Sequence, residues 1–317
     1  MNETSNKRNY LVIIIVLLLV AAIITGAGLC YLSWSDDYNP VVNSDHTQSA
    51  EASEVTESEE TDISETMVTT EAEESTEGTQ STTEEAEILA SNTVTMEQIF
   101  ITADGEYKYI KDGEVVSRKG IDVSKYQGNI DWKKAAFDGV KYAFIRVGCR
   151  GYGSSGTLIK DEKFHQNVKG ALEQGIQVGA YFFTQAITKE EALEEAELVI
   201  KELGDYEITY PVAIDVERIQ GSKARQDVLT AKERTEICKV FCEKIKEAGF
   251  IPMVYGDTET FAELIIPEEL AAYDFWICET DGTMTFPYEF AVWQYSHKGS
   301  VSGIKNDTNI SISLKEW

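Results

Sequence analysis

The sequence predicts an α/β fold in which strands and helices alternate around a closed barrel, preceded by a transmembrane helix and a disordered acidic stalk. Three observations lead to this prediction. Short apolar runs alternate with helical patterns through the C-terminal two thirds of the chain. An uncharged apolar stretch lies near the N-terminus, and a segment rich in Ser, Thr and Glu follows it. The 317 residues therefore divide into a membrane end, a linker and one folded part.

The N-terminal apolar stretch, residues 10–32, has 23 residues and no charge, which is long enough to span a bilayer. Lys7 and Arg8 precede it and acidic residues follow it, so the positive-inside tendency predicts that residues 1–9 are cytoplasmic and the rest is outside. A cleaved signal peptide, giving a secreted protein, is the alternative. Its apolar region is normally shorter, and a small-residue cleavage site is poorly formed here. We expect a single-pass membrane protein.

Residues 33–98 are predicted to be a disordered acidic linker. Between Asp36 and Gln98 there are 18 acidic residues and no Lys or Arg, a composition that cannot bury enough apolar surface to fold. This segment is expected to act as a stalk, with an inert linker as the alternative. The net charge of the chain is −27, and about −10 of it falls on residues 99–317, which argues against nucleic acid as a partner.

Cysteine and histidine residues are too few and too far apart in the sequence for a domain held together by disulfide bonds or a metal ion. The chain has five cysteines and three histidines. Cys238 and Cys242 are four positions apart in a predicted helix, and Cys149 and Cys278 lie in apolar runs typical of small buried side chains. We therefore expect no disulfide framework, no metal and no cofactor, and little material for a Ser-His-Asp triad.

The folded part begins with a short β-hairpin unit, residues 99–118, marked by the Asp104-Gly105 and Asp112-Gly113 turns. In residues 119–317, strands are expected at 120–123, 142–147, 176–183, 211–217, 251–255, 275–278 and 291–295. Helices are expected at 131–137, 161–174, 189–203, 231–248 and 257–264. This alternation predicts parallel strands with right-handed crossovers, and the strand number favours a closed barrel over an open sheet.

Two acids close one apolar strand, in the tripeptide Asp215-Val216-Glu217. Because side chains alternate along a strand, Asp215 and Glu217 point to the same side, with Cα atoms roughly 6.6 Å apart. Burying two neighbouring carboxyls raises the pKa of at least one of them. Acid/base hydrolysis of a glycosidic bond needs this arrangement, although an ordinary solvated strand end is the plain alternative.

Other polar and aromatic residues follow the carboxyl ends of the expected strands, where barrels place their active sites. They are Asp122, Tyr126, Tyr181, Trp276, Trp293, Gln294 and, near the C-terminus, Asp307. An acidic and aromatic collection suits a sugar, whose faces stack on rings and whose hydroxyls bond to carboxylates and amides. Core packing is the alternative for each aromatic residue.

Taken together, these residues resemble glycoside hydrolase family 25, the muramidases of the Chalaropsis lysozyme type. The matching motifs are GIDVSKYQG at 120–128, IDW at 130–132, FIR at 144–146, GAYFF at 179–183, PVAIDVE at 211–217 and AVWQY at 291–295. The resemblance implies an irregular, TIM-like β/α barrel over residues 119–317. It also implies cleavage of the β-1,4 bond between N-acetylmuramic acid and N-acetylglucosamine in peptidoglycan.

The resemblance also implies roles for individual residues. Glu217 matches the general acid, Asp215 the carboxylate that stabilises charge or orients the N-acetyl group, and Asp122 the carboxylate on the first strand. Substrate contacts are expected from Tyr181, Trp293, Gln294, Asp307, Tyr126 and Trp276. A catalytically inactive wall-binding module on the same barrel is the alternative, but such a module has no need to keep a proton donor beside its partner acid.

Overall fold

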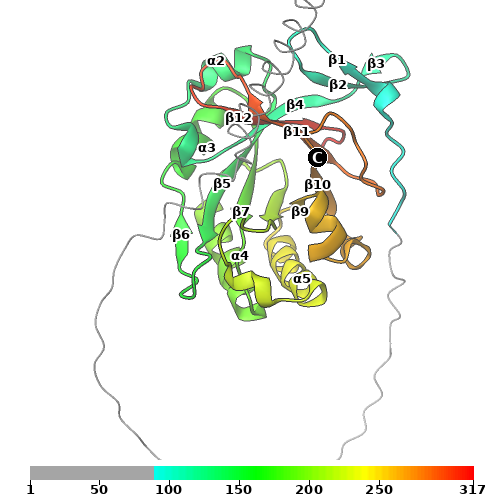
Figure 1. Cartoon of the computed structure of the whole chain (residues 1–317). Coiled ribbons are helices and arrows are strands. Elements are labelled where there is room, and N and C mark those ends of the chain that lie inside the picture. The colour runs from blue at the N-terminus through cyan, green and yellow to red at the C-terminus, as the bar shows by residue number, and fades with distance from the viewer. Residues whose placement is uncertain (1–88) are drawn as a thin grey trace, which may run out of the picture. The chain divides into compact units, whose positions relative to one another are not determined.

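The computed structural model describes residues 89–317 (Figure 1). The predicted membrane segment and residues 33–88 of the predicted linker lie outside this range. Within residues 89–317, none of the helices has the length and apolar character needed to cross a bilayer. Three short strands come first and form an antiparallel sheet: β1 (Ile99–Ile101), β2 (Tyr107–Lys111) and β3 (Glu114–Val115).

Eight strands close into a barrel. They are β4 (Arg118–Val123), β5 (Tyr142–Arg150), β7 (Gln177–Phe183), β8 (Val212–Asp215), β9 (Pro252–Asp257), β10 (Asp274–Cys278), β11 (Val292–Gly299) and β12 (Thr308–Ser313). Their order is β4-β12-β11-β10-β9-β8-β7-β5, and the pairing of β4 with β5 closes the ring. A short strand, β6 (Leu158–Lys160), pairs with the outer end of β5.

Helices cover the half of the barrel that contains β5 to β9. They are α2 (Trp132–Phe137), α3 (Phe164–Glu173), α4 (Lys189–Leu203) and α5 (Ala231–Glu247), followed by a π-helical turn, η4 (Thr260–Leu264). Short 3-10 turns are η1 (Met96–Gln98), η2 (Lys125–Gln127), η3 (Arg225–Val228) and η5 (Pro267–Leu270). Thr188 and Thr230 cap the starts of α4 and α5 by accepting backbone N–H bonds.

The final strand corrects the expectation of parallel pairing around the whole barrel. β12 runs antiparallel to both β11 and β4, and no helix lies between β10 and β11 or between β11 and β12. The antiparallel β11–β12 connection needs no helical crossover, and the parallel β10–β11 pair is joined by a crossover without a helix, so the sequence carries no helical period in either connection. The hairpin unit packs on this side instead, with Tyr107 stacked on Tyr295 at 4.3 Å and edge-on to Trp293 at 5.3 Å between ring centroids.

The barrel interior is filled by aromatic side chains below its carboxyl end. Phe144 stacks on Trp276 at 4.3 Å, and Tyr142 stacks on Tyr210 at 4.5 Å. Gly120 and Gly179 face these rings, because a Cβ atom at either position would lie within 2.6 Å of Tyr142 or Phe144. The filled interior is a packed layer that closes the barrel beneath the polar side chains above it.

The last ten residues of the predicted linker are ordered against the barrel. Asn92 pairs through its backbone N–H with Pro287 O at 2.9 Å and donates its side-chain amide to Phe286 O at 3.1 Å. Glu289 N–H donates to Ala90 O at 2.8 Å. Residues 89–98 therefore attach to the connection between β10 and β11, which differs from the expected disorder up to residue 98. These backbone pairs could not be read from composition.

Candidate active site

Four acidic side chains meet where the barrel strands reach their carboxyl ends. Asp122 is the penultimate residue of β4, Asp215 ends β8, Asp257 ends β9, and Glu217 follows β8 by two residues. Strand register brings them together: Asp215 is paired with Tyr255 of β9, and Asp257 with Cys278 of β10. Asp122, Asp215 and Glu217 lie near enough at this end of the barrel for their charges to act on one another.

Asp122 is held by two amides from distant parts of the chain. Gln294 Nε2 donates to its Oδ2 at 2.7 Å, and Asn309 Nδ2 donates to its Oδ1 at 2.9 Å. Asn309 stands opposite Asp122 in the β12–β4 register. A carboxyl group that receives an amide donor on each oxygen is fixed in orientation and favoured in its ionised form.

Asp215 and Glu217 lie in an environment that favours the neutral acid. Burial, and after it the charge of Asp257, raises the pKa of Glu217 to about 8. Burial, followed by the charges of Glu217 and Asp122, raises the pKa of Asp215 well above its usual range. Asp215 is 4 % exposed, and its Oδ1 has no hydrogen-bond partner among residues 89–317. Two neighbouring buried carboxyls that share one proton near neutral pH can supply general acid catalysis.

Comparison with known proteins explains this arrangement. The family model of glycosyl hydrolases family 25 matches residues 121–304, more than half of the chain. The chain belongs to glycosyl hydrolases family 25.

Relatives and solved structures agree with this membership. Lysozyme M1 of Streptomyces globisporus is 26% identical over 201 residues, covering 60% of this chain and 66% of the relative. The structure of the modular autolysin LytC from Streptococcus pneumoniae aligns with a TM-score of 0.55 at 22% identity, covering 70% of this chain and 57% of that one. A family 25 glycosyl hydrolase from Bacillus anthracis aligns at 0.53 with 24% identity, covering 68% and 96%. This chain thus spans less than two thirds of the first two proteins.

Tyr255 and Asn309 are two residues of this family 25 site that the sequence analysis missed. Tyr255 Oη lies 3.3 Å from Glu217 Oε1 and 3.0 Å from Gln294 Oε1. A tyrosine within an apolar strand gives no signal of its own in a single sequence. Period-two alternation offered a partial signal, because Tyr255 and Asp257 share one side of β9.

Three expected substrate contacts are buried in the structure, and these expectations are wrong for it. Trp293 is fully buried on the outer side of the sheet, where its Nε1 donates to Glu279 O at 2.9 Å. Trp276 is 2 % exposed and stacks in the barrel interior. Gln294 is 1 % exposed, and its side-chain amide donates to Asp122 instead of facing an open surface. Trp293 and Gln294 are neighbours on a strand, so only one of them can face the interior.

The other expected contacts lie nearer the surface. Tyr181 and Tyr126 are partly exposed; Tyr181 lies edge-on to Trp276, and the Tyr126 ring lies 5.2 Å from the Arg146 guanidinium. Asp307 is exposed, and its backbone oxygen accepts from Gln127 at 3.4 Å. Two residues further on, Asn309 donates its side-chain amide to Asp122.

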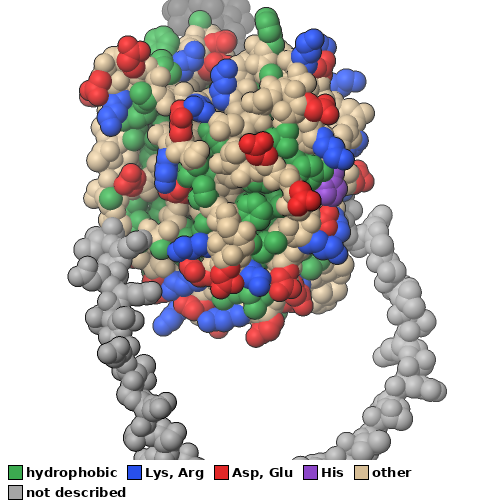
Figure 2. Space-filling model, turned by 180° about the vertical axis from the view of Figure 1, so that it is seen from behind, with side chains coloured by type: hydrophobic (Ala, Val, Ile, Leu, Met, Phe, Trp, Pro, Cys, Tyr) green, Lys and Arg blue, Asp and Glu red, His purple; other side chains and the backbone are tan. Residues whose placement is uncertain are grey.

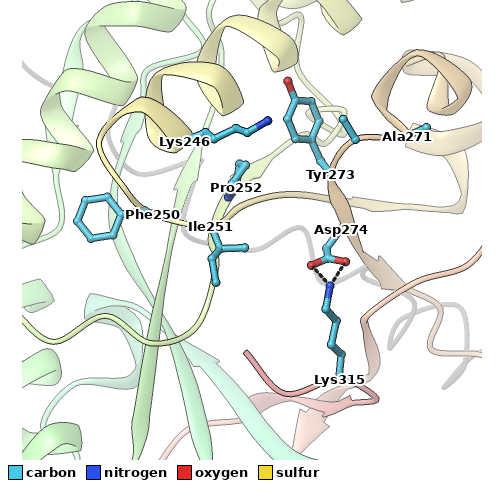
Figure 3. A pocket seen from close by; sticks show the side chains of 9 residues that line it. Lys246, Phe250, Ile251, Pro252, Ala271, Tyr273, Asp274 and Lys315 are labelled. Atoms are coloured by element: carbon cyan, nitrogen blue, oxygen red, sulfur yellow. Dashed lines mark hydrogen bonds and ion pairs between the residues drawn. The ribbon is translucent and has the colours of Figure 1, made fainter. Parts of the chain in front are cut away.

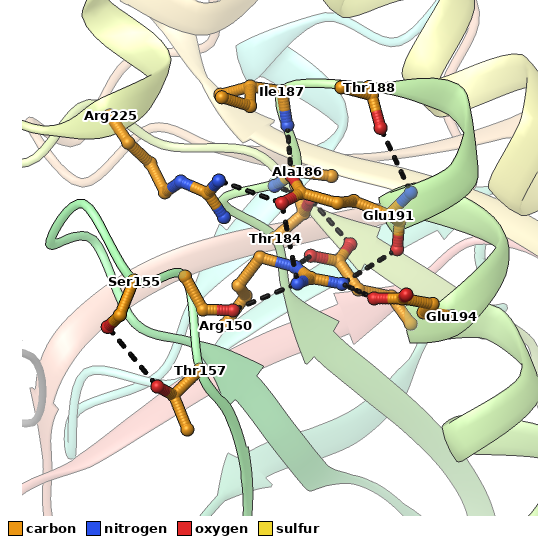
Figure 4. A network of polar contacts seen from close by, with 12 residues as sticks. Arg150, Ser155, Thr157, Thr184, Ala186, Ile187, Thr188, Glu191, Glu194 and Arg225 are labelled. Atoms are coloured by element: carbon orange, nitrogen blue, oxygen red, sulfur yellow. Dashed lines mark hydrogen bonds and ion pairs between the residues drawn. The ribbon is translucent and has the colours of Figure 1, made fainter. Parts of the chain in front are cut away.

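A buried ion-pair network lies beside the carboxyl end of β5 (Figure 4). Arg150, the last residue of β5, donates to Glu195 of α4 at 2.8 Å and to Gly156 O at 2.9 Å. Thr184 also donates to Glu195, at 2.7 Å. Burial raises the pKa of Glu195 to about 7, against the opposing effect of these donors. The network ties α4 to the loops that follow β5 and β7.

Other pockets and surfaces of residues 89–317 give less indication of a function than this end of the barrel does. The pocket in Figure 3, about 360 Å³, lies at the amino ends of β9 and β10, where Lys315 pairs with Asp274. That is the opposite end of the strands from the carboxyls. On the face in Figure 2, Lys and Arg are interspersed with Asp and Glu, and no continuous basic surface is formed. Residues 89–317 contain no group of three His, Cys, Asp or Glu side chains placed to hold a metal ion.

Proposed function

We propose that this family 25 glycoside hydrolase is a muramidase that cleaves the β-1,4 bond between N-acetylmuramic acid and N-acetylglucosamine in peptidoglycan. One observation carries the proposal: the half-buried carboxyl of Glu217, whose pKa is raised to about 8, lies beside the buried Asp215 at the barrel mouth. Lysozyme and autolysin relatives support the choice of substrate.

Glu217 acts as the general acid. Its raised pKa keeps the proton on the carboxyl at neutral pH, so it can protonate the leaving oxygen as the glycosidic bond breaks. A proton donor of this kind typically contributes about 10² to 10⁴ in rate.

Asp215 acts on the sugar ring in which positive charge develops as the glycosidic bond breaks. Its Oδ1 is buried without a partner, so it is an open acceptor. The N–H of the substrate's 2-acetamido group can satisfy it, which orients the acetyl oxygen toward the anomeric carbon. Asp122, fixed by Gln294 and Asn309, supplies the remaining negative field.

The placement of the enzyme is part of the proposal. Residues 10–32 anchor the chain in the cell membrane with residues 1–9 inside, and the acidic segment that follows spans the space to the wall glycan. The uncharged 23-residue stretch and its flanking charges support this topology.

The test uses the full chain in detergent micelles on purified peptidoglycan, followed by borohydride reduction and mass spectrometry of the products. Muramitol ends are expected from the wild type, and Glu217→Gln should lose at least about 100-fold in rate. Glu247→Gln, at the exposed end of α5, is the matched control and should keep full activity. Glucosaminitol ends would refute the bond assignment. Sedimentation with peptidoglycan without cleavage would support the wall-binding alternative.

A further inference from the structure

One line of hydrogen bonds joins the proposed general acid to the carboxylate on the first barrel strand. Glu217 Oε1 lies 3.3 Å from Tyr255 Oη, and Tyr255 Oη lies 3.0 Å from Gln294 Oε1. Gln294 Nε2 lies 2.7 Å from Asp122 Oδ2. Cys278 lies on the strand between those of Tyr255 and Gln294, and its thiol is within hydrogen-bond reach of the Tyr255 hydroxyl.

The direction of the donors along this line follows from what each group can do. Asp122, with an amide donor on each oxygen, is an ionised acceptor, so Gln294 must turn its NH₂ toward it. The amide oxygen of Gln294 then faces Tyr255, and an amide oxygen cannot donate. Tyr255 therefore donates its single hydroxyl hydrogen to Gln294 Oε1, which is nearer to it than Glu217 Oε1. Only lone pairs of Tyr255 are left for Glu217.

We propose that Tyr255 and Gln294 are positioning residues that form a one-way relay, in which ionised Asp122 orients Gln294, Gln294 orients the Tyr255 hydroxyl, and Tyr255 accepts a hydrogen bond from protonated Glu217. The inference rests on the proposed function, because it states how the resting general acid keeps its proton. In the reverse arrangement, Tyr255 would donate to an ionised Glu217 and Gln294 Oε1 would lose its donor.

The second amide on Asp122 provides an independent check. Asn309 Nδ2 donates to Asp122, so Asn309 Oδ1, which lies 3.3 Å from His297 Nδ1, must accept an N–H from it. His297 Nε2, 3.4 Å from Cys278 Sγ, then accepts the thiol hydrogen. Burial lowers the pKa of His297 and raises that of Cys278 well above its usual range, so both remain neutral. Both lines of donors end on Asp122.

Several other charged or titratable groups surround Glu217 and Asp215, so the test must leave them unchanged. On the neighbouring strands they are Asp122 of β4, Arg146 of β5, Asp257 of β9 and the neutral Cys278 of β10. Replacing Tyr255 by Phe alters no charge and almost no volume. Its effect on the pH profile therefore reports the hydrogen bond alone.

The decisive measurement is the alkaline limb of the kcat/KM profile of the full chain. Tyr255→Phe removes the acceptor of the Glu217 proton and should move this limb to lower pH by roughly half to one unit. Gln294→Met frees Tyr255 to donate to ionised Glu217 and should also move it to lower pH. Tyr273→Phe is the control, because its hydroxyl bonds Glu243 at the far end of the barrel, and should leave the limb in place. A limb that moves to higher pH in Tyr255→Phe, or does not move, overturns the relay.

Two nuclear magnetic resonance measurements separate failure of the relay from failure of the proposed function. A ¹³C carboxyl titration, with the Glu217 signal assigned by its loss in Glu217→Gln, should show the same downward shift in Tyr255→Phe without any substrate. In ¹⁵N spectra His297 should be protonated at Nδ1, and only His46 and His165 need to be distinguished from it. A wild type without glycan cleavage refutes the muramidase while these titrations still test the relay. An Nε2-protonated His297 overturns the convergence on Asp122.

Discussion

Replacing Glu217 by Gln should stabilise the fold, and the gain should depend on pH. The pKa of Glu217 in the folded protein is about 8, against an ordinary value of 4.5, because its carboxyl is buried near Asp257 and Asp122. The folded state therefore holds this proton more tightly than the unfolded state. Stability from this residue is fully present below about pH 4.5 and is lost as the pH rises toward 8. Glutamine does not titrate and escapes this loss.

The size of the effect follows from the same two values. A difference of about 3.5 in pKa, at about 1.4 kcal/mol for each pH unit, corresponds to about 5 kcal/mol. Glu217 is only half-buried, so contact with water reduces this figure, and it is an upper limit. Several kcal/mol is a substantial part of the stability of a domain of this size.

Urea unfolding of wild type and Glu217→Gln at pH 5, 7 and 8.5 measures the effect. The two proteins should differ little at pH 5, and the variant should become increasingly more stable toward pH 8.5. Glu247→Gln, which alters an exposed glutamate, should show no such trend. An equal difference between wild type and Glu217→Gln at all three pH values would refute the account of a buried, proton-holding acid.

Three further predictions concern other parts of the chain. Asp215→Asn should lower the cleavage rate by orders of magnitude and move the alkaline limb to lower pH, since it removes a charge beside the general acid; an unmoved limb would show that the two carboxyls are not coupled. Arg150→Met should lower the free energy of unfolding in urea by about 3–5 kcal/mol, because it leaves buried Glu195 without its ion pair. Glu194→Gln removes the more exposed partner of Arg150 and should lower it by under about 1 kcal/mol. Deleting residues 40–85 should leave activity on isolated peptidoglycan intact but abolish wall cleavage in cells, because 46 residues behaving as a flexible coil would span roughly 34–41 Å; equal cleavage in cells would reduce the segment to an inert linker.

The strands and helices with a clear period could be predicted closely. The Lys189–Leu203 helix was predicted at its observed bounds, and the strand that carries Asp215 differed only at its ends. The antiparallel β12 was missed, because TNISIS alternates too briefly to identify its pairing partners. Its place between β4 and β11 depends on contacts with residues far away in sequence.

Three of the four acids at the site were named from the sequence, whereas Asp257 and the groups that hold the acids were not. Asp215 and Glu217 stand out because two charges close an apolar run. Tyr255 and Asn309 gain their roles only from strand register, which brings Tyr255 beside Asp215 and Asn309 beside Asp122. The aromatic residues were misjudged for a related reason. A tryptophan near a strand end has the same sequence signature whether it faces a cleft, as expected for Trp293, or packs outside the barrel, as it does here.

The late position of β12 in the chain sets the moment at which the site comes into existence. Asp122 receives its two amides from residues 172 and 187 positions further along. At about 5–20 residues per second, a ribosome needs roughly 10–40 s to pass from Asp122 to β12. Until β12 has been made, β4 has an open edge and Asp122 lacks the amide of Asn309. A partly synthesised chain is therefore unable to cut glycan, so activity begins only after residues 308–313 have been added and have inserted between their neighbours.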